Sequence, residues 1–171
     1  MKPSGIFNFT ASTAANLKIA QFRIKKGELL SVKDQFTGPH EVNQSEWISC
    51  APFEKLLKIE ILDAADGNAK LRMPFLYKYA QGAGLMHGGA LAGLADTAAV
   101  MAIKTILPPH THFATVKMTT DFLKPVKSGC LTALAEAEAI DDKELKSAVN
   151  IYNADNEIVL KFSALFKRAS R

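Results

Sequence analysis

Residues 87–107 form an alanine-rich, apolar stretch that holds one acidic residue, Asp96, and stops before Pro108-Pro109. This stretch predicts a long helix, because a proline pair disfavours helical backbone in the residue before it. A surface helix keeps a polar face, and this one has almost none. We therefore expect other elements to enclose it. The alternative is a membrane span over residues 85–103, but the alanines, the glycines and Asp96 argue against it.

Segments of alternating apolar and polar residues flank this helix. A β-hairpin is predicted over residues 59–73, with Asp66-Gly67 as its turn. Four more strands are predicted after the helix, over residues 115–122, 131–138, 145–151 and 158–166. Alternation with a period of two indicates antiparallel strands with one buried face. The predicted fold is α+β, with a six-stranded antiparallel sheet wrapped around one long central helix.

Strict alternation also predicts the faces of the strand over residues 115–122. Val116, Met118, Thr120 and Phe122 would share one face, and Thr115 and Lys117 would lie on the other. The segment over residues 76–86 contains Gly82 and Gly84 and is predicted to be a loop.

The length of 171 residues suits one domain, which we place at residues 46–171, preceded by an N-terminal extension over residues 1–45. The extension lacks acidic residues through Lys26, which resembles an organellar transit peptide. We retain the other interpretation, a helix over residues 10–27 followed by a loop.

Composition excludes several classes of protein. The net charge of +4 is concentrated in residues 1–45, with six basic and three acidic residues, against fifteen and fourteen in the remainder. We therefore expect no nucleic-acid partner and no membrane. Cys50 and Cys130 form no CxxC pair, which favours a reducing, cytoplasmic location. No metal is expected, because the histidines show no HxxxH or HExxH spacing. A serine hydrolase is not expected either, because a G-x-S-x-G elbow is absent from the sequence.

The predicted helix starts with His87-Gly88-Gly89. Each glycine in a helix costs about 1 kcal/mol of stability relative to alanine, so we expect the two glycines to serve a purpose. One reason is that a ligand approaches free N–H groups at the positive end of the helix dipole, where a carbonyl oxygen would be polarised. The other is tight packing of the preceding loop.

Asp96 is the only acidic residue between Asp66 and Asp121, and its neighbours are Ala, Leu, Gly and Val. Burying an unpaired carboxylate costs several kcal/mol or raises its pKa. Asp96 is therefore either functional or a structural residue satisfied by a hydroxyl such as that of Thr97.

Gly88 and Asp96 are separated by eight positions, or about 12 Å along a helix. One small reacting group cannot touch both within one chain. If both act on the same carbonyl group, two antiparallel helices of a two-fold dimer must supply them.

Residues 84–99, GLMHGGALAGLADTAA, resemble the hotdog-fold acyl-CoA thioesterases. The resemblance is to the phenylacetate-degradation branch, which includes 4-hydroxybenzoyl-CoA thioesterases and thioesterase superfamily member 2. It extends over about residues 52–168 and includes the segments 52–57, 71–74, 122–125 and 128–129. The extension lies outside it.

The resemblance implies specific roles. The Gly88 N–H would polarise the thioester carbonyl, and Asp96 of the partner subunit would be the nucleophile or the general base. Gln81 would orient the thioester or the water, and Thr115 would help to place the attacking water. His87 and Gly89, at the helix start, would both contribute to substrate binding, and His87 would also position the loop there.

Coenzyme A carries phosphates, and the family tends to meet its nucleotide near the end of a strand. Lys124 and Lys127 lie there and are predicted to bind phosphate, although solvated surface charge also explains them. Coenzyme A belongs to the substrate, so no separate cofactor is expected.

The sequence thus predicts an acyl-CoA thioesterase that is at least a homodimer, with a tetramer implied by the resemblance. Two alternatives remain open. One is a hotdog dehydratase or hydratase that uses His87 and Asp96 on a hydroxyacyl thioester. The other is a non-catalytic acyl-CoA-binding module.

Overall fold

The computed structural model describes residues 51–169. The predicted N-terminal helix over residues 10–27, and the extension as a whole, lie outside the described residues. The elements are α2 (Pro52–Leu57), β1 (Glu60–Ala65), β2 (Asn68–Pro74), the 3₁₀ helix η2 (Tyr77–Tyr79), α3 (Gly88–Ile106), β3 (Phe113–Phe122), β4 (Cys130–Ala139), β5 (Glu144–Tyr152) and β6 (Ile158–Arg168).

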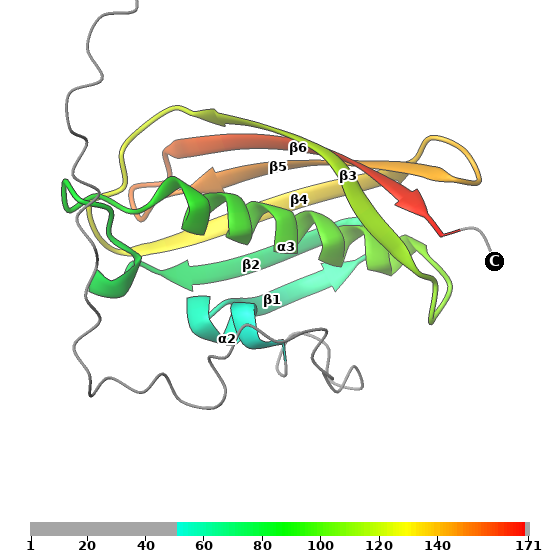
Figure 1. Cartoon of the computed structure of the whole chain (residues 1–171), viewed down its shortest axis with the longest axis horizontal. Coiled ribbons are helices and arrows are strands. Elements are labelled where there is room, and N and C mark those ends of the chain that lie inside the picture. The colour runs from blue at the N-terminus through cyan, green and yellow to red at the C-terminus, as the bar shows by residue number, and fades with distance from the viewer. Residues whose placement is uncertain (1–50, 170–171) are drawn as a thin grey trace, which may run out of the picture. The chain divides into compact units, whose positions relative to one another are not determined.

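All six strands belong to one antiparallel sheet with the order β1-β2-β4-β5-β6-β3. Helix α3 lies along one face of this sheet (Figure 1). The predicted α+β hotdog architecture is confirmed. The segment predicted as a loop over residues 76–86 is more ordered than expected, since it holds η2 and an isolated bridge between Ala80 and Met86.

The hairpin β1–β2 turns at the predicted dipeptide. Asp66 and Gly67 both have positive φ, at 47° and 79°, and Ala65 pairs with Asn68. This is the geometry of a two-residue type I′ turn, which matches the twist of the strands it joins. A Cβ on Gly67 would lie 2.8 Å from the carbonyl oxygen of Ala137, so the turn also requires glycine for space.

The core lies between α3 and the sheet. Four fully buried alanines, Ala95, Ala98, Ala99 and Ala102, allow the helix to approach the sheet closely. The sheet contributes large side chains that are also fully buried, among them Leu71, Met73, Leu131, Leu145, Ile151 and Phe166. Burial of each such side chain is worth about 1.5–3 kcal/mol.

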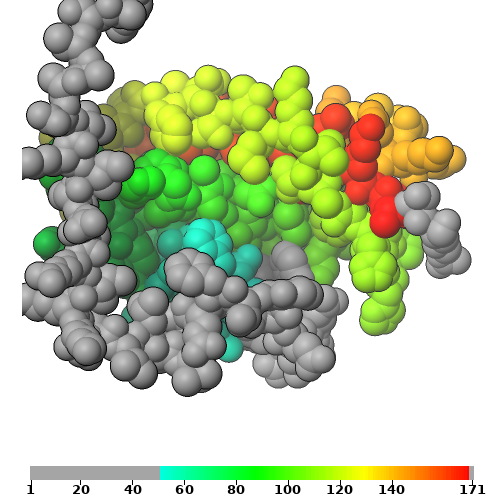
Figure 2. Space-filling model, in the orientation of Figure 1, coloured from blue at the N-terminus to red at the C-terminus, as the bar shows by residue number. Residues whose placement is uncertain are grey.

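The sheet covers only one side of α3. Ala92, Gly93, Asp96, Val100 and Met101 remain partly exposed along the opposite side. Figure 2 shows part of α3 at the surface between β3 and α2. The described part of the chain therefore encloses this apolar helix incompletely, because the sheet packs against only one side of it.

Strand β3 departs from the predicted alternation. A bulge between Thr115 and Lys117 shifts its register against β6, so that Thr115 pairs with Phe166 and Met118 pairs with Ala164. Phe166 and Ala164 both face the core, and Thr115 and Met118 therefore share the helix-facing side. The prediction that Thr115 lies opposite Met118 was wrong.

The face predicted to be buried in β3 is also largely exposed. Val116, Met118 and Phe122 have relative exposures of 51%, 50% and 58%. The physical reason is position: β3 is an edge strand, with β6 on one side and no other described strand on the other.

Helix α3 is long and apolar enough to cross a membrane by length and composition. It is also the core helix of the sheet described above, and core helices of soluble proteins pass the same test. Among residues 51–169 no other helix meets it.

Candidate active site

The start of α3 exposes one backbone donor. The His87 side chain caps the helix, since its Nδ1 accepts the Gly89 N–H at 2.8 Å, and the His87 carbonyl accepts the N–H groups of Ala90 and Leu91. The Gly88 N–H has no acceptor among residues 51–169. It lies at the positive end of the helix dipole, where it can bind a carbonyl oxygen or an anion.

Gly89 differs from Gly88 because its N–H is bonded and its missing side chain leaves room for His87. Its N–H is taken by His87, and a Cβ at this position would lie 3.0 Å from His87 Nδ1. The glycine therefore leaves room for the capping ring. The structure gives both His87 and Gly89 a positioning role at the helix start, and direct contact with substrate stays a prediction.

Gly88 and Gln81 line the same pocket, which has a volume of about 360 Å³. The Gln81 side-chain oxygen accepts the Ala83 N–H at 2.6 Å, and its backbone N–H donates to Leu85 at 2.8 Å. These bonds fix the loop before α3, and the carboxamide nitrogen can still donate a hydrogen bond to a ligand.

Two turns further along α3, Asp96 pairs with β3. The Thr115 hydroxyl donates a hydrogen bond to Asp96 Oδ1 at 3.0 Å. Burial raises the pKa of Asp96 above its ordinary value, and the bond from Thr115 opposes part of that rise. The hydroxyl partner is therefore Thr115 from β3, where the sequence had suggested Thr97.

The structure thus gathers the four predicted catalytic residues into two pairs. Gly88 and Gln81 form one pair at the helix start, and Asp96 and Thr115 form the other about 12 Å along the helix. Neither Asp96 nor Thr115 lines the 360 Å³ pocket. Each chain therefore carries a pair of residues at the helix start and a carboxylate pair further along α3, and the two pairs are separate from each other.

The two predicted phosphate-binding lysines differ. Lys124 lines the pocket, but its Nζ lies 2.6 Å from Glu157 Oε1, so a phosphate would have to compete with this ion pair. Lys127 is exposed and does not line the pocket.

Sequence reasoning missed one residue at this site. The Phe122 ring lies against Gly88, since its Cε1 and Cζ would be 3.1 Å from a Cβ there. The sequence pattern had grouped Phe122 with Val116 and Met118 on one face of β3, which was the available signal. Nothing in the pattern related it to the helix start.

Metal ligands are not gathered anywhere in residues 51–169. No group of three His, Cys, Asp or Glu side chains there could hold a metal ion.

A curled antiparallel sheet around one helix, with a free N–H at the helix start and a half-buried carboxylate on the same helix, defines a hotdog-fold thioester hydrolase. The comparisons agree with this class. A profile of the thioesterase superfamily matches residues 83–160. A candidate esterase of Bacillus subtilis, ComA2, is 30% identical over 105 residues, covering 60% of this chain and 82% of ComA2. The chain belongs to the thioesterase superfamily, which confirms the family and enzyme class expected from the sequence.

Two further relatives are similar to this chain. A candidate esterase of Halobacterium salinarum is 34% identical over 76 residues, and the match covers 42% of this chain and half of that protein. The solved structure of the PaaI protein from the phenylacetic acid degradation operon of E. coli superposes with a TM-score of 0.65 at 26% identity. That match covers 70% of this chain and 86% of PaaI.

Proposed function

We propose that this protein hydrolyses an acyl-CoA, fatty or aromatic, to the free acid and coenzyme A. The observation that carries the proposal is a pair of half-sites on α3. One is the Gly88 N–H, which has no acceptor among residues 51–169, and the other is a half-buried Asp96 held by Thr115. A thioester is already activated, so one polarising donor and one carboxylate suffice and no dissociable cofactor is needed.

The Gly88 N–H would stabilise the negative charge that develops on the thioester oxygen during attack. Asp96 would either attack the carbonyl carbon or remove a proton from water. Its raised pKa makes it a better base than an exposed aspartate. Thr115 would hold the carboxylate in place, and Gln81 would orient the thioester or the water.

A homodimer would complete the site by placing the partner subunit's Asp96 beside Gly88. The uncovered side of α3 and the open edge of β3 support this assembly. Val116 and Met118 leave apolar surface along that edge, and an unpaired edge strand favours pairing with a second copy.

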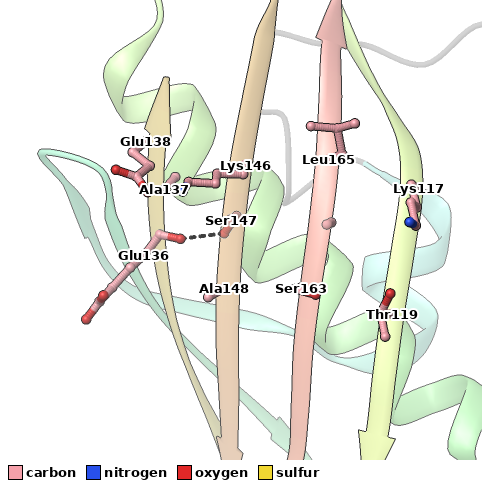
Figure 3. A pocket seen from close by; sticks show the side chains of 11 residues that line it. Lys117, Thr119, Glu136, Ala137, Glu138, Lys146, Ser147, Ala148, Ser163 and Leu165 are labelled. Atoms are coloured by element: carbon pink, nitrogen blue, oxygen red, sulfur yellow. Dashed lines mark hydrogen bonds and ion pairs between the residues drawn. The ribbon is translucent and has the colours of Figure 1, made fainter. Parts of the chain in front are cut away.

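The tetramer implied by the family resemblance would use the other face of the sheet. A groove of about 650 Å³ crosses β4, β5, β6 and β3 there (Figure 3). Small residues, Ala148 and Ser163, lie in its middle, Glu136 lies on β4, and Lys117 lies on β3. A two-fold axis parallel to the strands would set the carboxylate of one copy opposite the ammonium of another.

Coenzyme A recognition would involve Lys124, after release from Glu157, and Lys127. We further propose a cytoplasmic location, which a chain with two cysteines and no CxxC pair favours.

Incubation of the full chain with a panel of acyl-CoA thioesters tests this function. We expect release of free thiol, detected with a thiol reagent, from at least one acyl-CoA. A change in unsaturation without thiol release would instead indicate a dehydratase or hydratase. Binding without turnover, unchanged by Asp96→Asn, would indicate a non-catalytic module.

The contact between Thr115 and Asp96 predicts a pH effect. Thr115→Val removes a hydrogen bond that favours the ionised carboxylate, so the pKa of Asp96 should rise further. The acidic limb of the kcat/KM profile should move to higher pH, and the loss of rate should be largest in acid. Thr115→Ser keeps the hydroxyl and serves as the matched control. A profile lowered equally at every pH would contradict this role.

A further inference from the structure

Phe122 occupies an unusual place beside the candidate site. It is the last residue of the edge strand β3, and its side chain is more than half exposed. Two of its ring atoms would lie 3.1 Å from a Cβ on Gly88, so the ring stands directly against the residue with the free N–H. A side chain at position 88 would therefore have to displace the ring.

The pocket that Phe122 lines with Gly88 is mainly apolar. Leu85, Met86, Leu91 and Val126 form further parts of its wall. The polar side chains that line it are Gln81, whose oxygen is already bonded, and Lys124, which is paired with Glu157.

The position of the Phe122 ring indicates which part of a bound thioester would lie next to it. A thioester oxygen that accepts the Gly88 N–H lies about 2.9 Å from the nitrogen. Its carbonyl carbon is then about one bond length further away, within reach of a ring that contacts Gly88. Because the ring and Gly88 line the same pocket, substituents on the carbonyl carbon would lie close to the ring.

We propose that Phe122 is a specificity-determining residue, whose ring forms the wall of the acyl subsite and limits the bulk of the acyl group next to the thioester carbonyl. This inference rests on the proposed function. The acyl side is favoured because the wall is apolar, whereas the pantetheine arm of coenzyme A carries two amides that need hydrogen-bonding partners.

Substitutions that change the size of the ring test this role. Wild type, Phe122→Ala and Phe122→Trp are assayed with acetyl-, isobutyryl-, pivaloyl- and phenylacetyl-CoA. The ratio of kcat/KM for the bulky substrates to that for acetyl-CoA should rise about tenfold or more in Phe122→Ala and fall in Phe122→Trp. Leu134→Ala, which shortens a similarly exposed apolar residue on the other face of the sheet, should leave the ratio unchanged.

An equal change in kcat/KM for all four substrates would overturn the proposal. It would mean that the ring contacts the part of the substrate they share, the pantetheine arm, or only supports the fold. Size-exclusion chromatography and thermal melting identify any variant that fails to assemble or fold.

Binding gives a second measurement that does not need turnover. Ketone analogues of the same acyl-CoA series, in which a methylene replaces sulfur, are titrated calorimetrically. The ratio of Kd values should shift in the same direction as the kinetic ratio. If wild type binds the analogues and the ratio shifts but no thiol is ever released, the hydrolase proposal fails and the role of Phe122 stands. If wild type neither binds an analogue nor releases thiol, both proposals fail.

Discussion

Asp96→Asn is expected to lower kcat about 1,000-fold, because the amide can neither attack the thioester nor accept a proton from water. The substitution preserves shape, and the asparagine oxygen can still accept the Thr115 hydroxyl that bonds Asp96 Oδ1. Thiol release measured under saturating acyl-CoA gives kcat directly. Asp63→Asn, an exposed aspartate of β1, is the matched control and should retain full activity.

The same substitution should not destabilise the fold. Burial raises the pKa of Asp96 in the folded state, so the folded protein holds this proton more tightly than the unfolded chain. The stability contributed by the protonated carboxyl is present at low pH and is lost as the pH rises through the raised folded pKa. At neutral pH, Asp96→Asn should therefore melt at the same temperature as wild type or higher.

Thermal melts followed by circular dichroism from pH 5 to pH 8 check this sign. The difference in melting temperature between the variant and wild type should shrink as the pH falls. If Asp96→Asn is inactive and also melts at a lower temperature than wild type at neutral pH, loss of stability would explain the inactivity. That outcome would count against a catalytic role for Asp96.

Gly88→Pro is expected to lower kcat by about 10²- to 10³-fold, because proline removes the N–H that would stabilise the oxyanion. The backbone conformation at this position is compatible with proline. Gly88 is the first residue of α3, a position that accepts proline, and His87 before it has the extended ψ of 132° that proline requires of its neighbour. Gly88→Ala keeps the N–H and has only to displace the exposed ring of Phe122, so it should lose much less.

Mixing the two inactive variants tests whether the site is shared between chains. In a dimer of Asp96→Asn with Gly88→Pro, one site combines the intact Gly88 of the first chain with the intact Asp96 of the second. The other site has lost both groups. Random pairing makes half the dimers mixed, so coexpression should restore about a quarter of wild-type activity.

Two different affinity tags allow the mixed dimer to be isolated. Purified mixed dimer without activity would show that each chain works alone, and the geometry of the proposed site would then be wrong. Each variant assayed alone provides the baseline.

The local elements of this fold could be predicted because their causes are local. Asp66-Gly67 supports a type I′ turn in almost any context, and the hairpin forms around it. The helix predicted over residues 87–107 is observed as Gly88–Ile106, since the His87 side chain caps its start and the proline pair follows its end. In β4 and β5, the buried residues alternate with more exposed ones, as the predicted period of two requires.

The sequence also indicated the candidate catalytic residues, Gly88 and Asp96. Gly88 and Asp96 stand out by type, since one is a glycine at a helix start and the other is a lone acid in apolar surroundings. Their separation along a helix follows from the rise per residue, so the expectation that two chains share one site already followed from the spacing.

Tertiary structure decided what depends on register and on contact between distant segments. One bulge in β3 turns Thr115 toward Asp96, and strict alternation had put it on the opposite face. The Phe122 ring reaches Gly88 only because the end of β3 lies beside the start of α3. How much of the helix stays uncovered depends on how far the sheet curls. Such features arise from pairing between strands and packing between layers, whereas residue type and periodicity report only on each segment by itself.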